Sequence, residues 1–157
     1  MNVKAMALSC LLALVLTGCS RTDAEPSLPG VTVHKSASCG CCKVWVERLR
    51  SAGFPVEVRD VDNLNDVKQR VGIPYGKGAC HTAEVDGYFV EGHVPIDDVK
   101  RLLRERPDAK GLTVPGMPMG SPGMEVPSGQ VQPYAVLLVA RDGSTSVYSR
   151  HGTGATH

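Results

Sequence analysis

The sequence has few aromatic residues and no excess of charge of either sign. One Trp, four Tyr and two Phe occur among 157 residues, so the core has to be built mainly from Val, Leu and Ile. The 17 basic and 16 acidic residues give a formal net charge of +1, which offers no electrostatic reason to expect nucleic-acid binding. The length is that of one domain, and its small core would gain stability from a metal ion or a disulfide.

The N-terminus also lacks an apolar run long enough to span a bilayer. Lys4 precedes an apolar segment, residues 5–17, which is shorter than the ~20 residues that a spanning helix needs. The segment ends in the letters L-T-G-C at residues 16–19, and this pattern is similar to a bacterial lipoprotein signal. We therefore expect residues 1–18 to be a cleaved signal peptide and Cys19 to carry lipid.

A lipidated Cys19 would place the domain in the periplasm. Ser20 follows it where an Asp would favour retention in the inner membrane, so we expect an outer-membrane anchor. Several acyl chains, at about 0.8 kcal/mol per buried CH₂, make such an anchor stable. Residues 19–30 then form a flexible tether. An ordinary signal peptide cut near Ala24 and an uncleaved anchor are the alternatives.

Six cysteines are present, but two fall in the N-terminal segment. Cys10 would leave with the signal, and Cys19 would be lipidated. Four thiols remain in the mature chain: Cys39, Cys41, Cys42 and Cys80. In an oxidising compartment, thiols are either oxidised to disulfides or protected, and a metal ion is one protector.

Three of these cysteines lie on a predicted strand-to-helix turn. The β-type run Val31–Lys35 precedes them, and an amphipathic helical pattern from Val44 to Ala52 follows. At a helix N-terminus, free backbone N–H groups and the dipole favour thiolate over thiol. Two uses fit this turn. Either Cys39 and Cys42 form a C-x-x-C redox pair, or the three cysteines form a soft-metal site to which Cys41 adds a further ligand.

The remaining pattern predicts an α/β fold with the thioredoxin-like order β-α-β-α-β-β-α. The turn dipeptide Asp86-Gly87 marks a hairpin, and Pro95 is expected at the first position of the third helix. After the first strand and helix, the expected elements are a strand at 56–61, a helix at 64–71, strands at 82–85 and 88–91, and a helix at 95–104.

The C-terminal part is expected to add a β-hairpin to this domain, which would span residues 31–150. Its strands, 134–140 and 145–149, are joined through Asp142-Gly143 and should extend the sheet. Residues 107–133 show little regular pattern, and a loop of this length in a compact domain is usually either functional or disordered. Residues 151–157 are expected to form a loose tail.

Cys80 decides between the two uses of the turn. In a thioredoxin-like arrangement, the loop that enters the third strand packs against the C-x-x-C turn, so Cys80 is expected to meet the other three thiols. A small buried cysteine, or a plain disulfide with Cys41, is the alternative. If all four are oxidised, Cys39–Cys42 with Cys41–Cys80 is the plausible scheme, because a bridge between the adjacent Cys41 and Cys42 would be strained.

Four converging thiolates favour copper over zinc. Their negative charges, a few ångströms apart, need compensating cations. Several Cu(I) ions bridged by thiolates make a neutral cluster, whereas one Zn²⁺ would leave a net charge of about −2. Zinc sites also use paired C-x₂₋₄-C ligands more than three cysteines crowded in one turn.

The methionines and two histidines are further candidate ligands. The mature chain has three methionines, and all of them lie in one eight-residue stretch of a Pro/Gly-rich loop: Met117, Met119 and Met124. Thioether suits Cu(I), although gap-filling in the core is the alternative. His81 and His93 are candidates beside the cysteines, or ordinary hydrogen-bonded histidines. His34 is interpreted as a strand residue, and His151 and His157 as tail residues.

The motifs together resemble the CopG-like family of periplasmic copper-resistance proteins. They are S-x-S-C-G-C-C, C-H-T-A, D-G-Y, E-G-H-V-P and V-P-G-M-P-x-G-S-P-G-M-E, between about Val31 and Tyr148. The resemblance implies a thioredoxin-like domain that holds Cu(I) on its cysteines, with a role in copper redox handling. By position it implies cluster ligands at Cys39, Cys41, Cys42 and Cys80, with His81, His93, Met117 and Met124 as further contacts. Met119 falls at a variable position of the motif.

The leading hypothesis is a lipid-anchored periplasmic protein that binds copper, as a polynuclear Cu(I) centre, in copper homeostasis. Its expected partners are copper ions, the membrane and other periplasmic copper-handling proteins. A thiol–disulfide oxidoreductase that uses Cys39 and Cys42 is the second hypothesis, although Cys41 would invite misbridging in a dedicated dithiol catalyst. A disulfide-stabilised interaction module is the third.

Overall fold

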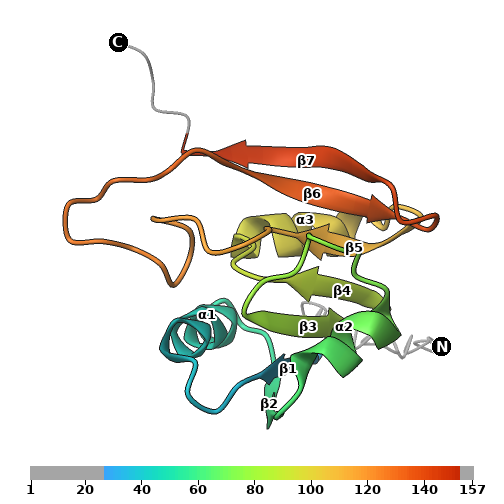
Figure 1. Ribbon diagram of the computed structural model, residues 1–157, viewed down its shortest axis with the longest axis horizontal. Helices are drawn as coiled ribbons and strands as arrows, with labels where there is room; N and C mark the ends of the chain where they lie inside the picture. Colours follow the sequence, from blue (N-terminus) through green and yellow to red (C-terminus); the bar gives the residue numbers. More distant parts are fainter. Residues whose placement is uncertain (1–26, 153–157) are drawn as a thin grey trace, which may run out of the picture.

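In the computed structural model, residues 27–152 are described, and they form one mixed sheet with helices on both faces. The spatial order of the strands is β2-β1-β3-β4-β5-β6-β7, which Figure 1 shows stacked from bottom to top. In chain order the elements are β1 (Val31–Lys35), α1 (Gly40–Ser51), β2 (Val56–Asp60), α2 (Leu64–Val71), β3 (His81–Val85), β4 (Tyr88–Glu91), α3 (Ile96–Glu105), β5 (Ala109–Thr113), β6 (Tyr134–Ala140) and β7 (Thr145–His151).

The part from β1 to α3 has the predicted thioredoxin-like topology. β1 and β2 are parallel and joined through α1, and β3 is antiparallel to both β1 and β4. The Asp86-Gly87 turn joins β3 to β4 as expected, with positive φ at both residues. This topology brings the start of β3 beside the end of β1, because His81 pairs with Lys35. The cysteine turn follows Lys35 directly.

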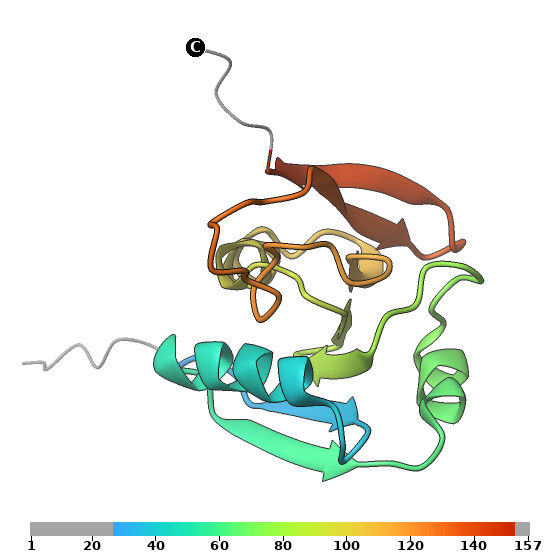
Figure 2. The same ribbon diagram turned by 60° about the vertical axis from the view of Figure 1, so that its left-hand side comes forward.

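The two faces of the sheet carry different helices. Ala83 and Val85 of β3 pack in one core with Trp45 and Leu49 of α1 and with Leu102 of α3. The alternate residues of β3 point to the other face, where Thr82 and Glu84 contact Lys68 and Arg70 of α2. The views in Figures 1 and 2 agree that α2 (green) lies apart from α1 (cyan).

The C-terminal hairpin extends the sheet, but it does so through a strand that the sequence pattern did not reveal. Ala109–Thr113, expected to be irregular, forms β5, parallel to β4 and antiparallel to β6. The segment contains Gly111, which weakens any strand pattern. A Cβ at Gly111 would overlap the carbonyl of Phe89, so the glycine allows the close approach of the two backbones.

Three predicted boundaries are corrected by the structure. α1 begins at Gly40 rather than at Val44, so Cys41 and Cys42 lie inside its first turn. Pro95 is the N-cap of α3 rather than its first helical residue. β7 runs to His151, which was expected in the tail, because its side chain lies 2.7 Å from Asp98 Oδ2 and its ring stacks on Tyr134.

Part of the predicted organisation lies outside the described residues. This applies to the signal peptide, to the lipid-bearing Cys19 and to His157. Among residues 27–152, no helix combines the length and apolar character needed to cross a bilayer.

Candidate metal site

The cysteine turn lies between the end of β1 and the first turn of α1. Cys39 is the N-cap of α1 with an extended backbone, and its side chain makes no capping hydrogen bond. Gly40 follows, and Cys41 and Cys42 occupy the first turn of the helix. Cys42 is fully buried, whereas Cys41 is partly exposed. The turn therefore presents sulfurs both to the interior and to the surface.

Cys80 joins these three residues from the loop before β3, as the topology predicts. The sulfur atoms of Cys39, Cys41, Cys42 and Cys80 all lie within 4.8 Å of one another. Cys42 Sγ also lies 3.7 Å from the carbonyl oxygen of Cys80, although 38 residues separate the two. The alternatives for Cys80, a small buried cysteine or a plain disulfide with Cys41, are therefore wrong, since Cys80 is partly exposed and free.

The thiols are not all in one oxidation state. Cys39 and Cys42 form a disulfide, the pair expected for a C-x-x-C motif on this turn. The second bridge of the fully oxidised scheme is absent, since Cys41 and Cys80 are free. Reduction of the Cys39–Cys42 bond would leave four thiols within reach of a single metal centre.

Two histidines surround the sulfur of Cys80 on its inner side. Nε2 of His93 lies 3.1 Å from Cys80 Sγ, and Nδ1 of His81 lies 3.4 Å from the same atom. Both rings are fully buried, and they meet edge to face at a centroid distance of 5.0 Å. Cys80, His81 and His93 thus form a second group of donor atoms that shares its sulfur with the first.

The hydrogen bond of His93 fixes which nitrogen faces the sulfur. Its Nδ1 lies 2.8 Å from the carbonyl oxygen of Pro122, which can only accept, so Nδ1 carries the proton. In the neutral ring Nε2 then has a free electron pair directed at Cys80. Such orientation of one ring nitrogen by a carbonyl is common in metal-binding histidines.

Burial governs the protonation of this group in the metal-free protein. Burial, followed by the proximity of Cys41, raises the pKa of the Cys80 thiol to about 12. Burial likewise lowers the pKa of His81 to about 3, and it lowers the pKa of His93 against the opposing hydrogen bond to Pro122. Near neutral pH the histidines are neutral donors, and a metal bound at Cys80 would have to displace a proton.

The loop that carries Met117, Met119 and Met124, here called the methionine loop, approaches this site through its turn at Pro122-Gly123. A Cβ on Gly123 would lie 2.9 Å from the carbonyl oxygen of Cys41 and 3.4 Å from Nδ1 of His93, so the loop backbone packs directly on both. Both views show the loop (orange) beside α1. Met124 follows this turn and is partly buried.

The other two methionines are more exposed than Met124. Met117 is 52% exposed and Met119 is 37% exposed. A ligand role for Met117 and Met124 stays a prediction. For Met124 it is supported by the neighbouring Gly123, which packs on Cys41 and His93.

Sequence reasoning missed the residues that support the site. Trp45, interpreted as a helix core residue, also packs against His81, with ring centroids 4.5 Å apart and the rings tilted by 40°, and it donates from Nε1 to the carbonyl of Val94. Glu91 and Lys68 form a buried ion pair behind the loop that carries Cys80. One signal for Glu91 was present, since it is an acidic residue at the end of the apolar strand Tyr88-Phe89-Val90.

Comparison with known proteins finds a family model and two similar solved structures. A family model described as "Protein of unknown function, DUF411" matches residues 77–124. Two solved structures of copper resistance protein CopG, forms 2 and 1, are 45% identical to this chain, with TM-scores of 0.75 and 0.74. Each covers 79% of this chain, which in turn covers 98% of each.

A shorter similarity reaches a different protein. A stretch of 63 residues is 40% identical to a probable phosphoenolpyruvate synthase of Pyrococcus abyssi (strain GE5 / Orsay). It amounts to 40% of this chain but spans only 8% of that relative.

Fold and site together define the class of the protein: a thioredoxin-like domain whose cysteine turn is part of a four-cysteine cluster that could hold a metal ion. The match at 45% identity, which covers 98% of each solved chain, then shows the family. The chain belongs to the CopG-like copper-resistance family.

Proposed function

We propose that this protein binds copper as Cu(I) on Cys39, Cys41, Cys42 and Cys80, as part of copper resistance and homeostasis. One observation carries the proposal: the four sulfur atoms lie within 4.8 Å of one another. Thiolates at this spacing repel each other strongly unless cations lie between them. Cu(I) is soft, monovalent and able to bridge sulfurs, so several ions neutralise the four charges, which one Zn²⁺ would not do.

The surrounding residues extend this donor set. His93 and His81 offer neutral nitrogens toward Cys80, and Met124 is the thioether nearest in sequence to the turn that packs on the site. We assign the cysteines as the primary ligands, with His81, His93, Met117 and Met124 as additional contacts. The disulfide of Cys39 and Cys42 must be reduced before the centre can fill.

Anaerobic reconstitution tests this proposal. The chain without residues 1–19 is reduced, loaded with Cu(I) and freed of unbound metal, and copper per chain is measured together with X-ray absorption at the copper edge. We expect more than one copper per chain, sulfur-dominated ligation and a Cu–Cu distance. A stoichiometry well below one copper per chain would contradict the proposal.

The cellular location is proposed from the N-terminal sequence. Cleavage before Cys19 and lipid on its sulfur would hold the domain in the periplasm, on the outer membrane. Fractionation of cells that express the full chain tests this point, with Cys19→Ala as the control. The wild-type chain is expected in the outer-membrane fraction at a mass that includes acyl chains, and the variant is expected outside it. Equal distribution of both would contradict the anchor.

A second function is favoured by the disulfide itself. The Cys39–Cys42 bond at the start of α1 has the placement of a thiol–disulfide oxidoreductase motif. Reduction of insulin by the reduced protein, lost in Cys39→Ser, would support this activity. No reduction above that of free dithiothreitol would leave copper binding as the function of the turn.

A further inference from the structure

A buried ion pair lies directly behind the loop that carries Cys80. Glu91, the last residue of β4, is fully buried, and its carboxylate pairs with the ammonium of Lys68 from α2. The hydroxyl of Thr82 donates to the other carboxylate oxygen at 2.6 Å, and Lys68 also donates to Thr82 at 3.1 Å. A charge in this position is tolerated only with such partners.

The remaining partner of Glu91 links the pair to the metal site. The backbone N–H of Ala79 donates to Glu91 Oε1 at 2.5 Å. Ala79 directly precedes Cys80, and the loop around it has no regular secondary structure to hold it. On the other side of Cys80, the backbone carbonyl of His81 accepts from the backbone N–H of Gly92 at 3.1 Å. The Cys80 backbone is therefore held on one side by Glu91 and on the other by Gly92.

The segment that contains Glu91 and Gly92 continues directly into His93. Glu91 and Gly92 therefore set the position of the Cys80 backbone relative to the imidazole that faces its sulfur. Packing reinforces this arrangement, since a Cβ on Gly92 would lie 2.6 Å from the Cβ of Ala79. No contact of Glu91 with a candidate ligand atom is required for this effect.

We infer that Glu91, held by Lys68, is a positioning residue for copper binding that places Cys80 against the cysteine turn. The inference rests on the proposed function, because copper is the ligand whose binding it affects. Residues that orient ligands in this way commonly change metal affinity by about tenfold to a hundredfold when they are replaced.

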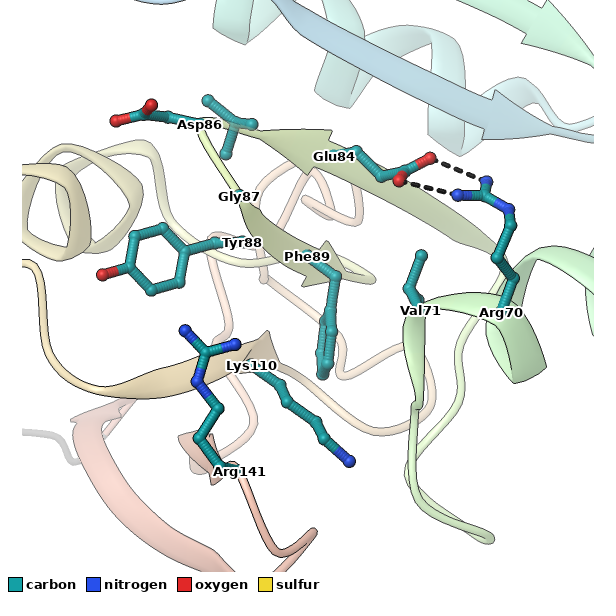
Figure 3. A pocket seen from close by; sticks show the side chains of 10 residues that line it. Arg70, Val71, Glu84, Asp86, Gly87, Tyr88, Phe89, Lys110 and Arg141 are labelled. Atoms are coloured by element: carbon teal, nitrogen blue, oxygen red, sulfur yellow. Dashed lines mark hydrogen bonds and ion pairs between the residues drawn. The ribbon is translucent and has the colours of Figure 1, made fainter.

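A neighbouring, more exposed ion pair offers a control for the loss of a link between α2 and the sheet. Glu84 of β3 accepts two hydrogen bonds from Arg70, so it also links α2 to the sheet. Figure 3 shows this pair at the rim of a surface pocket of about 330 Å³ that no cysteine or histidine lines. Glu84 makes no hydrogen bond to the loop that carries Cys80.

The experiment compares Glu91→Leu and Glu91→Gln with Glu84→Leu and Glu84→Gln. Cu(I) affinity is measured by competition with a chelator, and circular dichroism and thermal unfolding report the fold. We expect Glu91→Leu to bind Cu(I) about ten to a hundred times more weakly, since it cannot accept from Ala79. Glu91→Gln keeps an amide oxygen for Ala79 but loses the charge that holds Lys68, so we expect a loss of about two- to fivefold. The Glu84 variants should match the wild-type affinity.

A second readout follows the loop without copper. In chains that carry Cys39→Ser, Cys41→Ser and Cys42→Ser, the rate at which iodoacetamide alkylates Cys80 reports its protection. Glu91→Leu should raise this rate about tenfold over Glu84→Leu, and Glu91→Gln should fall between them. If Glu91→Leu does not fold, the comparison of Glu91→Gln with Glu84→Gln tests the inference. Equal copper affinity and equal alkylation in that isosteric pair would overturn the inference.

The two readouts separate the inference from the proposed function. If the wild-type chain binds no copper while Glu91→Leu still exposes Cys80, the proposed function is wrong and the anchoring of the loop stands. If the wild-type chain binds copper and folded Glu91→Leu binds it equally well, the positioning role alone is wrong.

Discussion

The sulfur of Cys80 lies 3.1 Å from Nε2 of His93, and the carbonyl of Pro122 fixes the ring so that this nitrogen carries no proton. Three separate segments thus determine one contact: the loop before β3, the turn after β4 and the methionine loop. A thiol and a neutral imidazole at this distance are a preformed pair of donors for a soft cation.

Replacement of His93 should therefore weaken copper binding without preventing it. His93→Gln removes the imidazole beside Cys80 but leaves all four cysteines, so we expect Cu(I) affinity to fall about tenfold. Chelator competition measures the change, and X-ray absorption should show fewer nitrogen ligands. His34→Gln is the control, because His34 faces Glu84 on β3 rather than the cysteines. Equal affinity of the two variants would speak against a ligand at position 93.

Gly123 should be sensitive to a single added methyl group. Its φ is +92°, and a Cβ would lie 2.9 Å from the carbonyl oxygen of Cys41. Gly143→Ala is the matched control, since its φ is +88° but nothing lies within 4 Å of the added Cβ. Both changes carry the cost of a left-handed backbone, about 1–2 kcal/mol.

Only Gly123→Ala adds the clash, which should remove about 1–3 kcal/mol more of the free energy of unfolding. Urea unfolding of the reduced, metal-free protein measures the difference. If both variants lose the same stability, the loop does not pack on the cysteine turn.

Acid should destabilise the metal-free protein through His81. Its pKa is lowered from 6.5 to about 3 in the folded state, chiefly by burial. Between these values the unfolded chain binds one more proton than the folded chain, so stability is complete above pH ~6.5 and is lost as the pH falls. The slope from this residue approaches about 1.4 kcal/mol per pH unit, and His93 acts in the same direction.

Urea unfolding of the reduced protein at pH 7 and pH 5.5 measures this effect. The wild-type chain should lose about 1 kcal/mol or more between the two conditions, and His81→Gln should lose less. An identical loss in both proteins would show that His81 does not titrate as its burial requires.

The fold could be predicted where local signals agree with tertiary structure. The bounds of α2, Leu64–Val71, follow from its apolar stripe and from Gly72, whose φ is +78°, and the structure adds Asn63 as the N-cap. β5 could not be predicted in this way. Its residues carry no strand pattern, and the strand exists because β4 and β6 provide partners on both sides.

The candidate site was partly predictable for a similar reason. The meeting of Cys80 with the cysteine turn follows from topology, because the thioredoxin-like order places the start of β3 beside the end of β1. The roles of Glu91 and Lys68 depend on a buried contact between α2 and β4, which no local pattern records. The approach of Gly123 to Cys41 likewise arises only when the long loop folds back.

The most direct test of the account is the copper content of Cys80→Ser compared with that of Cys42→Ser. Both reduced proteins are loaded anaerobically with Cu(I), and copper per folded chain is determined. Since all four sulfurs lie within 4.8 Å of one another, we expect each variant to lose about half or more of the bound copper, with fewer Cu–S contacts in X-ray absorption. Full copper content in Cys80→Ser beside a loss in Cys42→Ser would contradict a shared four-cysteine centre.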